Sequence, residues 1–249
     1  MSIEDLESVA QAMVAPGKDI IAIDESTATI KKRFESVGIE NTEENRRAYR
    51  ELLLTSPGLS DHISGAILYD ETIRQSTKDG VPFPQLMKKL GIIPGIKVDK
   101  GPQPLAGFPG DVVTEGLDGL RERLQEYAKL GAQFAKWRAV INITEENPSS
   151  TAIEANAHAL ARYAALCQEA GIVFLSGGQS DKDATAHLNA MNRMGPHPWP
   201  LSFSYGRAMQ QAALKLWSED MVGKYAAAQQ TVSARAKDNG LAALGQWKG

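Results

Sequence analysis

Charged and hydroxyl side chains interrupt the apolar strand candidates of this sequence near their C-terminal ends. A single buried lysine would more often belong to an edge strand or reach out to solvent. Polar residues near the ends of five of the six candidate strands favour a functional explanation instead, because burying charges without a purpose costs free energy. The carboxyl ends of parallel strands are where α/β enzymes build their sites, so we expect these side chains to form a functional cluster. Its members are the cations Lys97, Lys136, Arg138 and Arg207, the acids Asp24 and Asp99, and the hydroxyls of Ser26, Thr29, Ser176 and Ser204.

The composition of this cluster fits an anionic substrate with two separated charged ends. A carboxylate beside lysines suits proton transfer during carbon–carbon chemistry. A lysine that is removed from water among other cations has a lowered pKa and becomes a candidate nucleophile toward a carbonyl.

Two groups of residues are candidates for holding the two anionic ends. Ser176-Gly177-Gly178 lies between the apolar run Ile172–Leu175 and a helical pattern, so its backbone N–H groups are candidates for an anion cradle. Arg207, directly after Gly206, adds a bidentate clamp. By itself the Ser-Gly-Gly stretch is more often an ordinary turn between a strand and a helix. The second group is formed by Ser26, Thr29 and Lys97.

Strand and helix patterns alternate six times along the chain, which predicts a parallel α/β sheet. A closed barrel of this kind normally has eight units, so an open doubly wound sheet competes with it on periodicity alone. The strand candidates are Asp19–Asp24, Ile63–Tyr69, Gly95–Val98, Phe134–Ile141, Ile172–Leu175 and Leu201–Tyr205.

The helices are predicted from capping residues and apolar spacing. Asn41 or Thr42 caps a helix that runs to about Leu54, and Ile153, Ala157, Leu160, Ala164 and Cys167 mark the apolar face of another. The Pro- and Gly-rich pieces Gly101–Gly110 and Gly195–Pro200 are expected to be loops. Further helical patterns cover Met1–Ala15, Leu117–Tyr127, Ala184–Met191, Gly206–Trp217 and Lys224–Lys237.

Composition limits the function classes. The 249 residues suit a single domain, with 43% hydrophobic residues and a net charge of −3. This charge gives no reason to expect binding to nucleic acid or to a membrane. The single cysteine, Cys167, excludes an intramolecular disulfide and, without a recognisable signal sequence, indicates the cytoplasm. The four histidines are isolated, and Walker and Gly-x-Gly-x-x-Gly motifs are absent, so we expect no metal and no nucleotide cofactor.

Five stretches of the chain resemble the class I, or Schiff-base, fructose-1,6-bisphosphate aldolases, especially the bacterial ones. The resemblance implies a (β/α)8 TIM barrel and a lyase of glycolysis and gluconeogenesis. Such an enzyme cleaves a phosphorylated sugar, fructose 1,6-bisphosphate, reversibly into dihydroxyacetone phosphate and glyceraldehyde 3-phosphate. A homo-oligomer is one possible assembly. The stretches are Ile23–Thr27, Gly95–Gly101, Phe134–Arg138, Phe174–Gln179 and Phe203–Arg207.

The resemblance also implies roles for individual residues. Asp24 resembles the carboxylate beside the bond that breaks. Lys136 resembles the lysine that assists carbinolamine and proton steps, with Arg138 next to it. The phosphate grip nearest the ketone is matched by Ser176, Gly177, Gly206 and Arg207, and the contacts to the other phosphate by Ser26, Thr29, Arg33 and Lys97.

The chain departs from the family pattern after the helix that ends near Cys167. The family continues with a strand ending in Glu-Pro-Glu and a later Leu-Lys-Pro strand whose lysine forms the Schiff base, and neither motif occurs here. We therefore expect one domain over residues 1–249 with a deletion seam near 171–174, reduced to about six β/α units. No Schiff-base lysine is found, and without an iminium the electrons released by cleavage have no sink. An open sheet would also expose the edge of Phe134–Ile141.

Several interpretations of this pattern stay open. The chain is an aldolase by descent with impaired or lost catalysis, or a non-catalytic phosphosugar-binding remnant, or a truncated gene product from an error in the gene reading. An active variant that uses Lys136 as the nucleophile is the weakest interpretation, because a lysine serving proton transfer is rarely placed for carbonyl attack.

Overall fold

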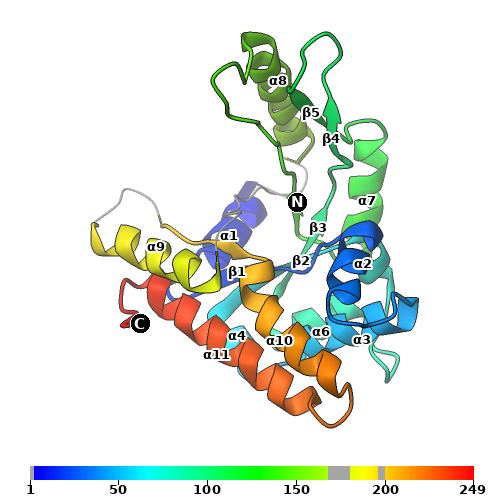
Figure 1. The fold of residues 1–249 in the computed structure, drawn as a ribbon, viewed down its shortest axis with the longest axis vertical. Helices are drawn as coiled ribbons and strands as arrows, with labels where there is room; N and C mark the ends of the chain where they lie inside the picture. Colours follow the sequence, from blue (N-terminus) through cyan, green and yellow to red (C-terminus); the bar gives the residue numbers. More distant parts are fainter. Residues whose placement is uncertain (1–2, 168–179, 196–199) are drawn as a thin grey trace.

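The computed structural model describes residues 3–167, 180–195 and 200–249. Within these residues a five-stranded parallel sheet forms the centre of the molecule, in the order β6-β3-β2-β1-β7 (Figure 1). β1, β2 and β6 are entirely buried, as near-continuous apolar strands of a parallel sheet should be. The strands are β1 (Asp19–Ala22), β2 (Ile63–Leu68), β3 (Ile93–Lys97), β6 (Phe134–Lys136) and β7 (Ser204–Tyr205).

Helices cover the sheet and bury a large aromatic core. Tyr49 of α3 stacks on Trp217 of α10 with ring centroids 5.5 Å apart, and Phe34 of α2 meets the edge of Tyr49 at 5.7 Å. The helices are α1 (Ile3–Met13), α2 (Thr27–Glu35), α3 (Glu43–Leu54), α4 (Leu59–His62), α5 (Asp70–Arg74), α6 (Phe83–Leu90), α7 (Leu120–Leu130), α8 (Ser150–Cys167), α9 (Asp181–Arg193), α10 (Arg207–Glu219) and α11 (Tyr225–Ala243). None of the described helices is long and apolar enough to cross a membrane.

Local signals in the sequence explain where several helices begin. Thr42 is the N-cap of α3 and accepts a hydrogen bond from the backbone N–H of Asn45 at 3.1 Å, as the sequence predicted. Glu43 and Glu44 in the first turn favour this helix through its dipole. Ser26 caps α2 in the same way and thereby fixes the turn that follows β1.

A hairpin replaces the predicted loop after β3. β4 (Gly101–Pro104) pairs in antiparallel fashion with β5 (Val112–Glu115), so the expectation of a loop over Gly101–Gly110 is wrong in its first part. Pro102 and Pro104 made a strand hard to predict, because proline cannot donate a backbone hydrogen bond. Proline is nevertheless tolerated in an edge strand such as this one. The hairpin and α8 form an arm that extends away from the sheet, at the top of Figure 1.

The predicted strand Phe134–Ile141 ends early. β6 stops at Lys136, where its neighbour β3 also stops at Lys97, and the two lysines are opposite each other in the register. Among the described residues β6 pairs with β3 alone, so residues 137–141 have no strand to extend against. The predicted strand Ile172–Leu175 lies outside the described residues. The described part of the sheet therefore ends at β6 on one side and at β7 on the other.

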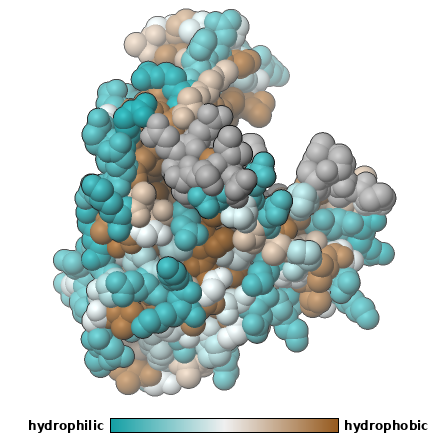
Figure 2. Space-filling model, turned by 180° about the vertical axis from the view of Figure 1, so that it is seen from behind, coloured by the Kyte–Doolittle hydropathy of each residue, from teal (hydrophilic) through white to brown (hydrophobic). Residues whose placement is uncertain are grey.

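The apolar face predicted for α8 is wrong at three positions, because Ile153, Ala157 and Leu160 are exposed. Ile153 and Leu160 are 52% and 39% exposed, and Ile143 in the preceding segment is 84% exposed. The helix instead packs through Ala152, Asn156, Tyr163 and Cys167, its buried residues. Seen from behind, hydrophobic surface also gathers in the middle of the molecule (Figure 2). The units that would follow in an eight-stranded barrel are not found among the described residues.

Candidate active site

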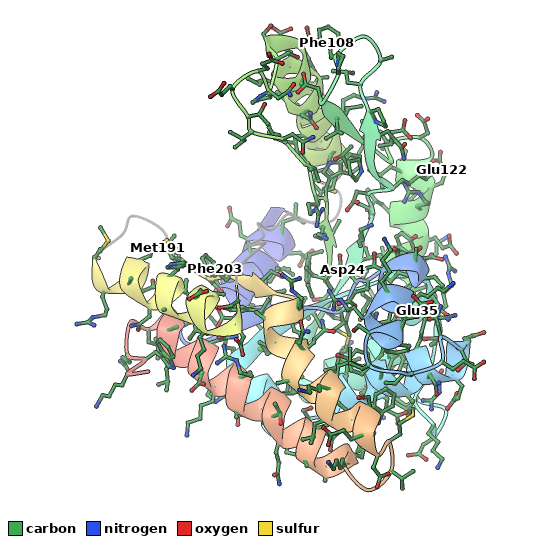
Figure 3. The ribbon with its side chains drawn as sticks, viewed as in Figure 1. Asp24, Glu35, Phe108, Glu122, Met191 and Phe203 are labelled. Atoms are coloured by element: carbon green, nitrogen blue, oxygen red, sulfur yellow. The ribbon has the colours of Figure 1, made fainter. Side chains whose placement is uncertain are left out.

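A cavity of about 670 Å³ opens at the carboxyl ends of β1, β3 and β6. Asp24 lies near the middle of the molecule, whereas Phe108 and Glu122 lie on the side of the arm (Figure 3). The cavity wall contains eight of the residues predicted for the site: Asp24, Ser26, Thr29, Arg33, Lys97, Asp99, Lys136 and Arg138. They come from separate parts of the chain, which the parallel sheet brings to one edge.

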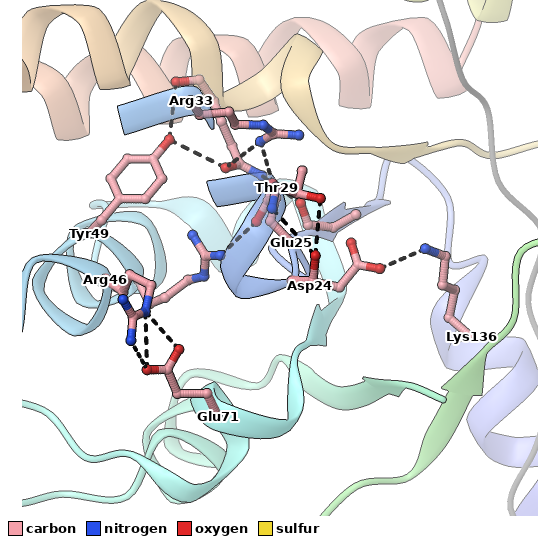
Figure 4. A network of polar contacts seen from close by, with 12 residues as sticks. Asp24, Glu25, Thr29, Arg33, Arg46, Tyr49, Glu71 and Lys136 are labelled. Atoms are coloured by element: carbon pink, nitrogen blue, oxygen red, sulfur yellow. Dashed lines mark hydrogen bonds and ion pairs between the residues drawn. The ribbon is translucent and has the colours of Figure 1, made fainter. Parts of the chain in front are cut away.

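Asp24 and Lys136 form the central contact of the cavity. The Lys136 ammonium donates to the Asp24 carboxylate at 2.6 Å, across 112 positions of sequence (Figure 4). The side chains are only 12% and 7% exposed, so water screens the pair weakly. Since an acid and a base lie side by side in the cavity wall, the pair can pass a proton to or from a group in the cavity.

Asp99 organises the neighbouring wall. Lys97 lies 3.2 Å from one carboxylate oxygen, and the backbone N–H of Gly101 donates to the same oxygen at 3.2 Å. The second oxygen accepts from the backbone N–H of Arg138 at 3.3 Å. A single buried carboxylate therefore joins the ends of β3 and β6, and its position beside Lys97 agrees with the predicted cluster.

The N-terminal end of α2 faces the same cavity. The Ser26 hydroxyl accepts from the backbone N–H of Thr29 at 3.4 Å, and the two hydroxyls lie 3.1 Å apart. Both side chains line the cavity beside Arg33 one turn further on. Hydroxyls, a guanidinium and the positive end of a helix dipole together favour an anion here.

Sequence reasoning missed Glu25 and two of its three partners, Arg50 and Gln210, whereas Arg33 was predicted for the site. The Glu25 carboxylate, 4% exposed, pairs with Arg33 and lies 2.7 Å from the Arg50 guanidinium. The Gln210 amide donates to the same carboxylate at 3.1 Å and accepts from the Tyr49 hydroxyl at 3.3 Å. Burial raises the pKa of Tyr49, so its hydroxyl keeps its proton. The position of Glu25 directly after Asp24 could have indicated a site residue. Its pairing could not be predicted, because its partners lie 8, 25 and 185 positions away.

A second missed group closes the cavity on the side of the arm. Arg123 donates to the backbone carbonyls of Val98 at 3.0 Å and of Gly116. Arg74 pairs with Asp70 at 2.9 Å and with Glu126 at 2.6 Å. Arg74 is neutralised by the two acids, whereas Arg123 is held by neutral carbonyls and adds a positive charge to the cavity wall.

The remaining predicted residues are not brought into this cavity. Ser176 and Gly177 lie outside the described residues. Gly206 immediately precedes α10, and Arg207 at the start of that helix is exposed. Neither belongs to the cavity wall formed by the described residues. The strand that precedes them, β7, lies on the opposite side of β1 from β2, β3 and β6. The described residues also contain no group of three or more metal-ligating side chains.

Comparison with known proteins identifies this arrangement. The family model described as fructose-bisphosphate aldolase class-I matches the chain in two segments, residues 5–173 and 169–249. The chain belongs to the class I fructose-bisphosphate aldolase family. A probable class 1 fructose-bisphosphate aldolase of Xanthomonas campestris is 58% identical, with all of both chains covered. Fructose-bisphosphate aldolase 1 of Toxoplasma gondii is 40% identical over 99% of this chain and 92% of its own.

The structural comparison agrees on the fold. The aldolase of Plasmodium falciparum, solved in complex with TRAP and a small-molecule inhibitor, superimposes with a TM-score of 0.94 at 37% identity, covering 99% of this chain and 96% of the other. The chain therefore has the TIM-barrel type of α/β fold. The alignment with the Xanthomonas relative runs over 334 positions, 85 more than the 249 residues here. Together with the two family segments that meet at residues 169–173, this agrees with an internal deletion in an aldolase.

Proposed function

We propose that the chain binds fructose 1,6-bisphosphate or its triose phosphate products in the cavity, at an aldolase site that has lost its Schiff-base lysine. The contact between Asp24 and Lys136 carries this proposal, because an acid–base pair lies inside a cavity that also offers cations and hydroxyls. The relatives are named as aldolases, which supports a phosphorylated sugar as the ligand.

Each part of the cavity has a proposed task. Ser26, Thr29, Arg33 and Lys97 hold one phosphate, helped by the dipole of α2. Asp24 and Lys136 lie beside the carbon chain and exchange protons with its hydroxyl groups. Arg138, exposed at the rim, attracts the anionic ligand. Ser176, Gly177, Gly206 and Arg207 remain a proposed grip for the second phosphate.

The cleavage step is proposed to be lost. The sequence contains neither the Glu-Pro-Glu motif nor the Leu-Lys-Pro motif of the family. Lys136 is not proposed to replace the missing lysine as nucleophile, because its side-chain nitrogen is engaged by Asp24 at 2.6 Å as the partner of that carboxylate in proton transfer. We therefore propose that ancestors of this chain catalysed the aldolase reaction of glycolysis and that the present chain does not. That reaction is the cleavage to dihydroxyacetone phosphate and glyceraldehyde 3-phosphate.

Two further points follow from the relatives. Plant relatives are named as cytosolic or cytoplasmic isozymes, which supports a cytoplasmic location for this chain. Resequencing the gene across the codons for residues 169–173 tests whether the truncated product arises from an error in the reading; an additional in-frame segment of about 85 codons would show that the gene encodes a full-length aldolase.

Calorimetric titration with fructose 1,6-bisphosphate tests the binding proposal. We expect saturable heat for the natural chain and a loss of at least about tenfold in affinity for Lys136→Met, since this change leaves Asp24 as an unpaired anion in the cavity. Lys129→Met is the control, because Lys129 is exposed and does not line the cavity. Absence of saturable heat in the natural chain would refute the binding proposal.

A further inference from the structure

Glu25 is a buried acid that two arginines share. One carboxylate oxygen accepts from Arg33 and from the Gln210 amide at 3.1 Å, and the other lies 2.7 Å from the Arg50 guanidinium. Two positive charges therefore face a single negative charge. This small cluster keeps one positive charge in excess at the wall of the cavity.

The two arginines differ in their access to the cavity. Arg50 is 2% exposed, packs over the Tyr49 ring at 5.6 Å, and does not belong to the cavity wall. Arg33 is 24% exposed and lines the cavity. Of the two, only Arg33 can turn toward an anion that enters.

Glu25 stays satisfied if Arg33 turns away. Arg50 continues to neutralise its charge, and Gln210 continues to donate to it. Gln210 is itself fixed, since it is 1% exposed and also donates to the carbonyl of Ala22 at the end of β1. Leaving a buried carboxylate without any partner would be strongly unfavourable, but here the pairing with Arg50 remains.

We infer that Glu25 is a specificity-determining residue that competes with the ligand for Arg33. This inference rests on the proposed function and adds a charge requirement to it. An incoming anion must replace an existing ion pair, and attraction to a guanidinium rises with the charge of the anion. A doubly charged phosphate ester replaces Glu25, whereas a singly charged phosphodiester or carboxylate does not.

Removing the competing charge tests this inference. Glu25→Gln should bind fructose 1,6-bisphosphate about tenfold more tightly, which corresponds to about 1.4 kcal/mol, and should gain binding of dimethyl phosphate, a single anion. Its urea midpoint should fall, because Arg50 loses its counterion. Glu35→Gln is the matched control: Glu35 is exposed on α2, and the change in net charge is the same. A purely structural role for Glu25 predicts lower affinity together with lower stability.

A double-mutant cycle separates competition from a general charge effect. In an Arg33→Met background, Glu25→Gln should leave the affinity unchanged; an equal gain in both backgrounds overturns the inference. If the natural chain binds and Glu25→Gln binds with the same affinity, the inference is overturned but the proposed function stands. If neither protein binds, the proposed function is overturned as well. Binding by Glu25→Gln only supports competition and contradicts the proposed function. If Glu25→Gln does not fold, Glu25→Gln/Arg50→Met replaces it in the cycle, because it removes both buried charges.

Discussion

Among single residues, Asp19 has an unusual position for a carboxylate. It is fully buried at the start of β1, where one oxygen accepts from the Ser202 hydroxyl at 2.9 Å and from the backbone N–H of Phe203 at 3.3 Å. Its second oxygen has no hydrogen-bond partner in the described structure. Desolvation by burial raises the pKa of Asp19 to about 7, against the opposing effect of these hydrogen bonds. Burial therefore favours the protonated form of Asp19, although its hydrogen bonds from Ser202 and Phe203 favour the carboxylate.

This position predicts a loss of stability as the pH rises. Between about pH 4 and pH 7 the unfolded chain releases the Asp19 proton while the folded chain retains it, so the free energy of unfolding decreases, by on the order of 4 kcal/mol in total. Asp19→Asn should remove most of this decrease and be the more stable protein at pH 8. Urea unfolding at pH 5 and pH 8 measures this decrease in the free energy of unfolding. Asp79→Asn is the control, because Asp79 is exposed. Equal pH slopes for the natural chain and Asp19→Asn would refute this assignment.

At the scale of elements, α8 is attached to β6 although its outer face is exposed. The Tyr163 hydroxyl donates to the carbonyl of Ala135 on β6 at 2.9 Å, and its ring packs on Trp137 at 5.4 Å. Cys167, one turn later, is fully buried, and burial raises the pKa of its thiol to about 11. The thiol is thus both inaccessible and protonated wherever α8 is docked.

Cys167 consequently reports on the docking of α8. We expect its reaction with a thiol reagent at pH 8 to be at least about a hundredfold slower in the native chain than in urea, because the thiolate is the reactive species. Tyr163→Phe should speed the native reaction by removing the hydrogen bond to β6. Alkylation of the native chain at the rate of the unfolded chain would mean that α8 is not packed in solution.

The elements also show what the sequence can and cannot predict. The ends of β1 and β3 were predicted to within two residues because Asp24 and Lys97 interrupt apolar runs, whereas β6 was predicted to continue to Ile141 and ends at Lys136. The start of α3 was predictable because Asn41 and Thr42 are both capping residues, and Thr42 is the one that caps the helix. The hairpin β4–β5 was missed because prolines and glycines dominate it. The pairing of Glu25 was missed because it joins α2, α3 and α10, and no local pattern connects partners so distant in the chain.

For the whole molecule, the family alignment and the sheet describe the same loss. The described sheet ends at β6 and at β7, the two family segments meet at residues 169–173, and the aligned relative extends over 85 more positions. Among the described residues, β1, β3 and β6 bring Asp24 and Lys136 together in one cavity. The Leu-Lys-Pro motif expected to supply the Schiff-base lysine does not occur in the sequence. The proposed function therefore separates binding and proton transfer from carbon–carbon cleavage.

One measurement tests this separation directly: the mass of the chain after incubation with dihydroxyacetone phosphate and reduction with borohydride. A version with the missing segment of the Xanthomonas relative inserted at residues 169–173 is the positive control. The natural chain is predicted to keep its unmodified mass, while the repaired chain gains one reduced triose phosphate adduct. A stoichiometric adduct on the natural chain, mapped to Lys136 or to any other lysine, would contradict the account.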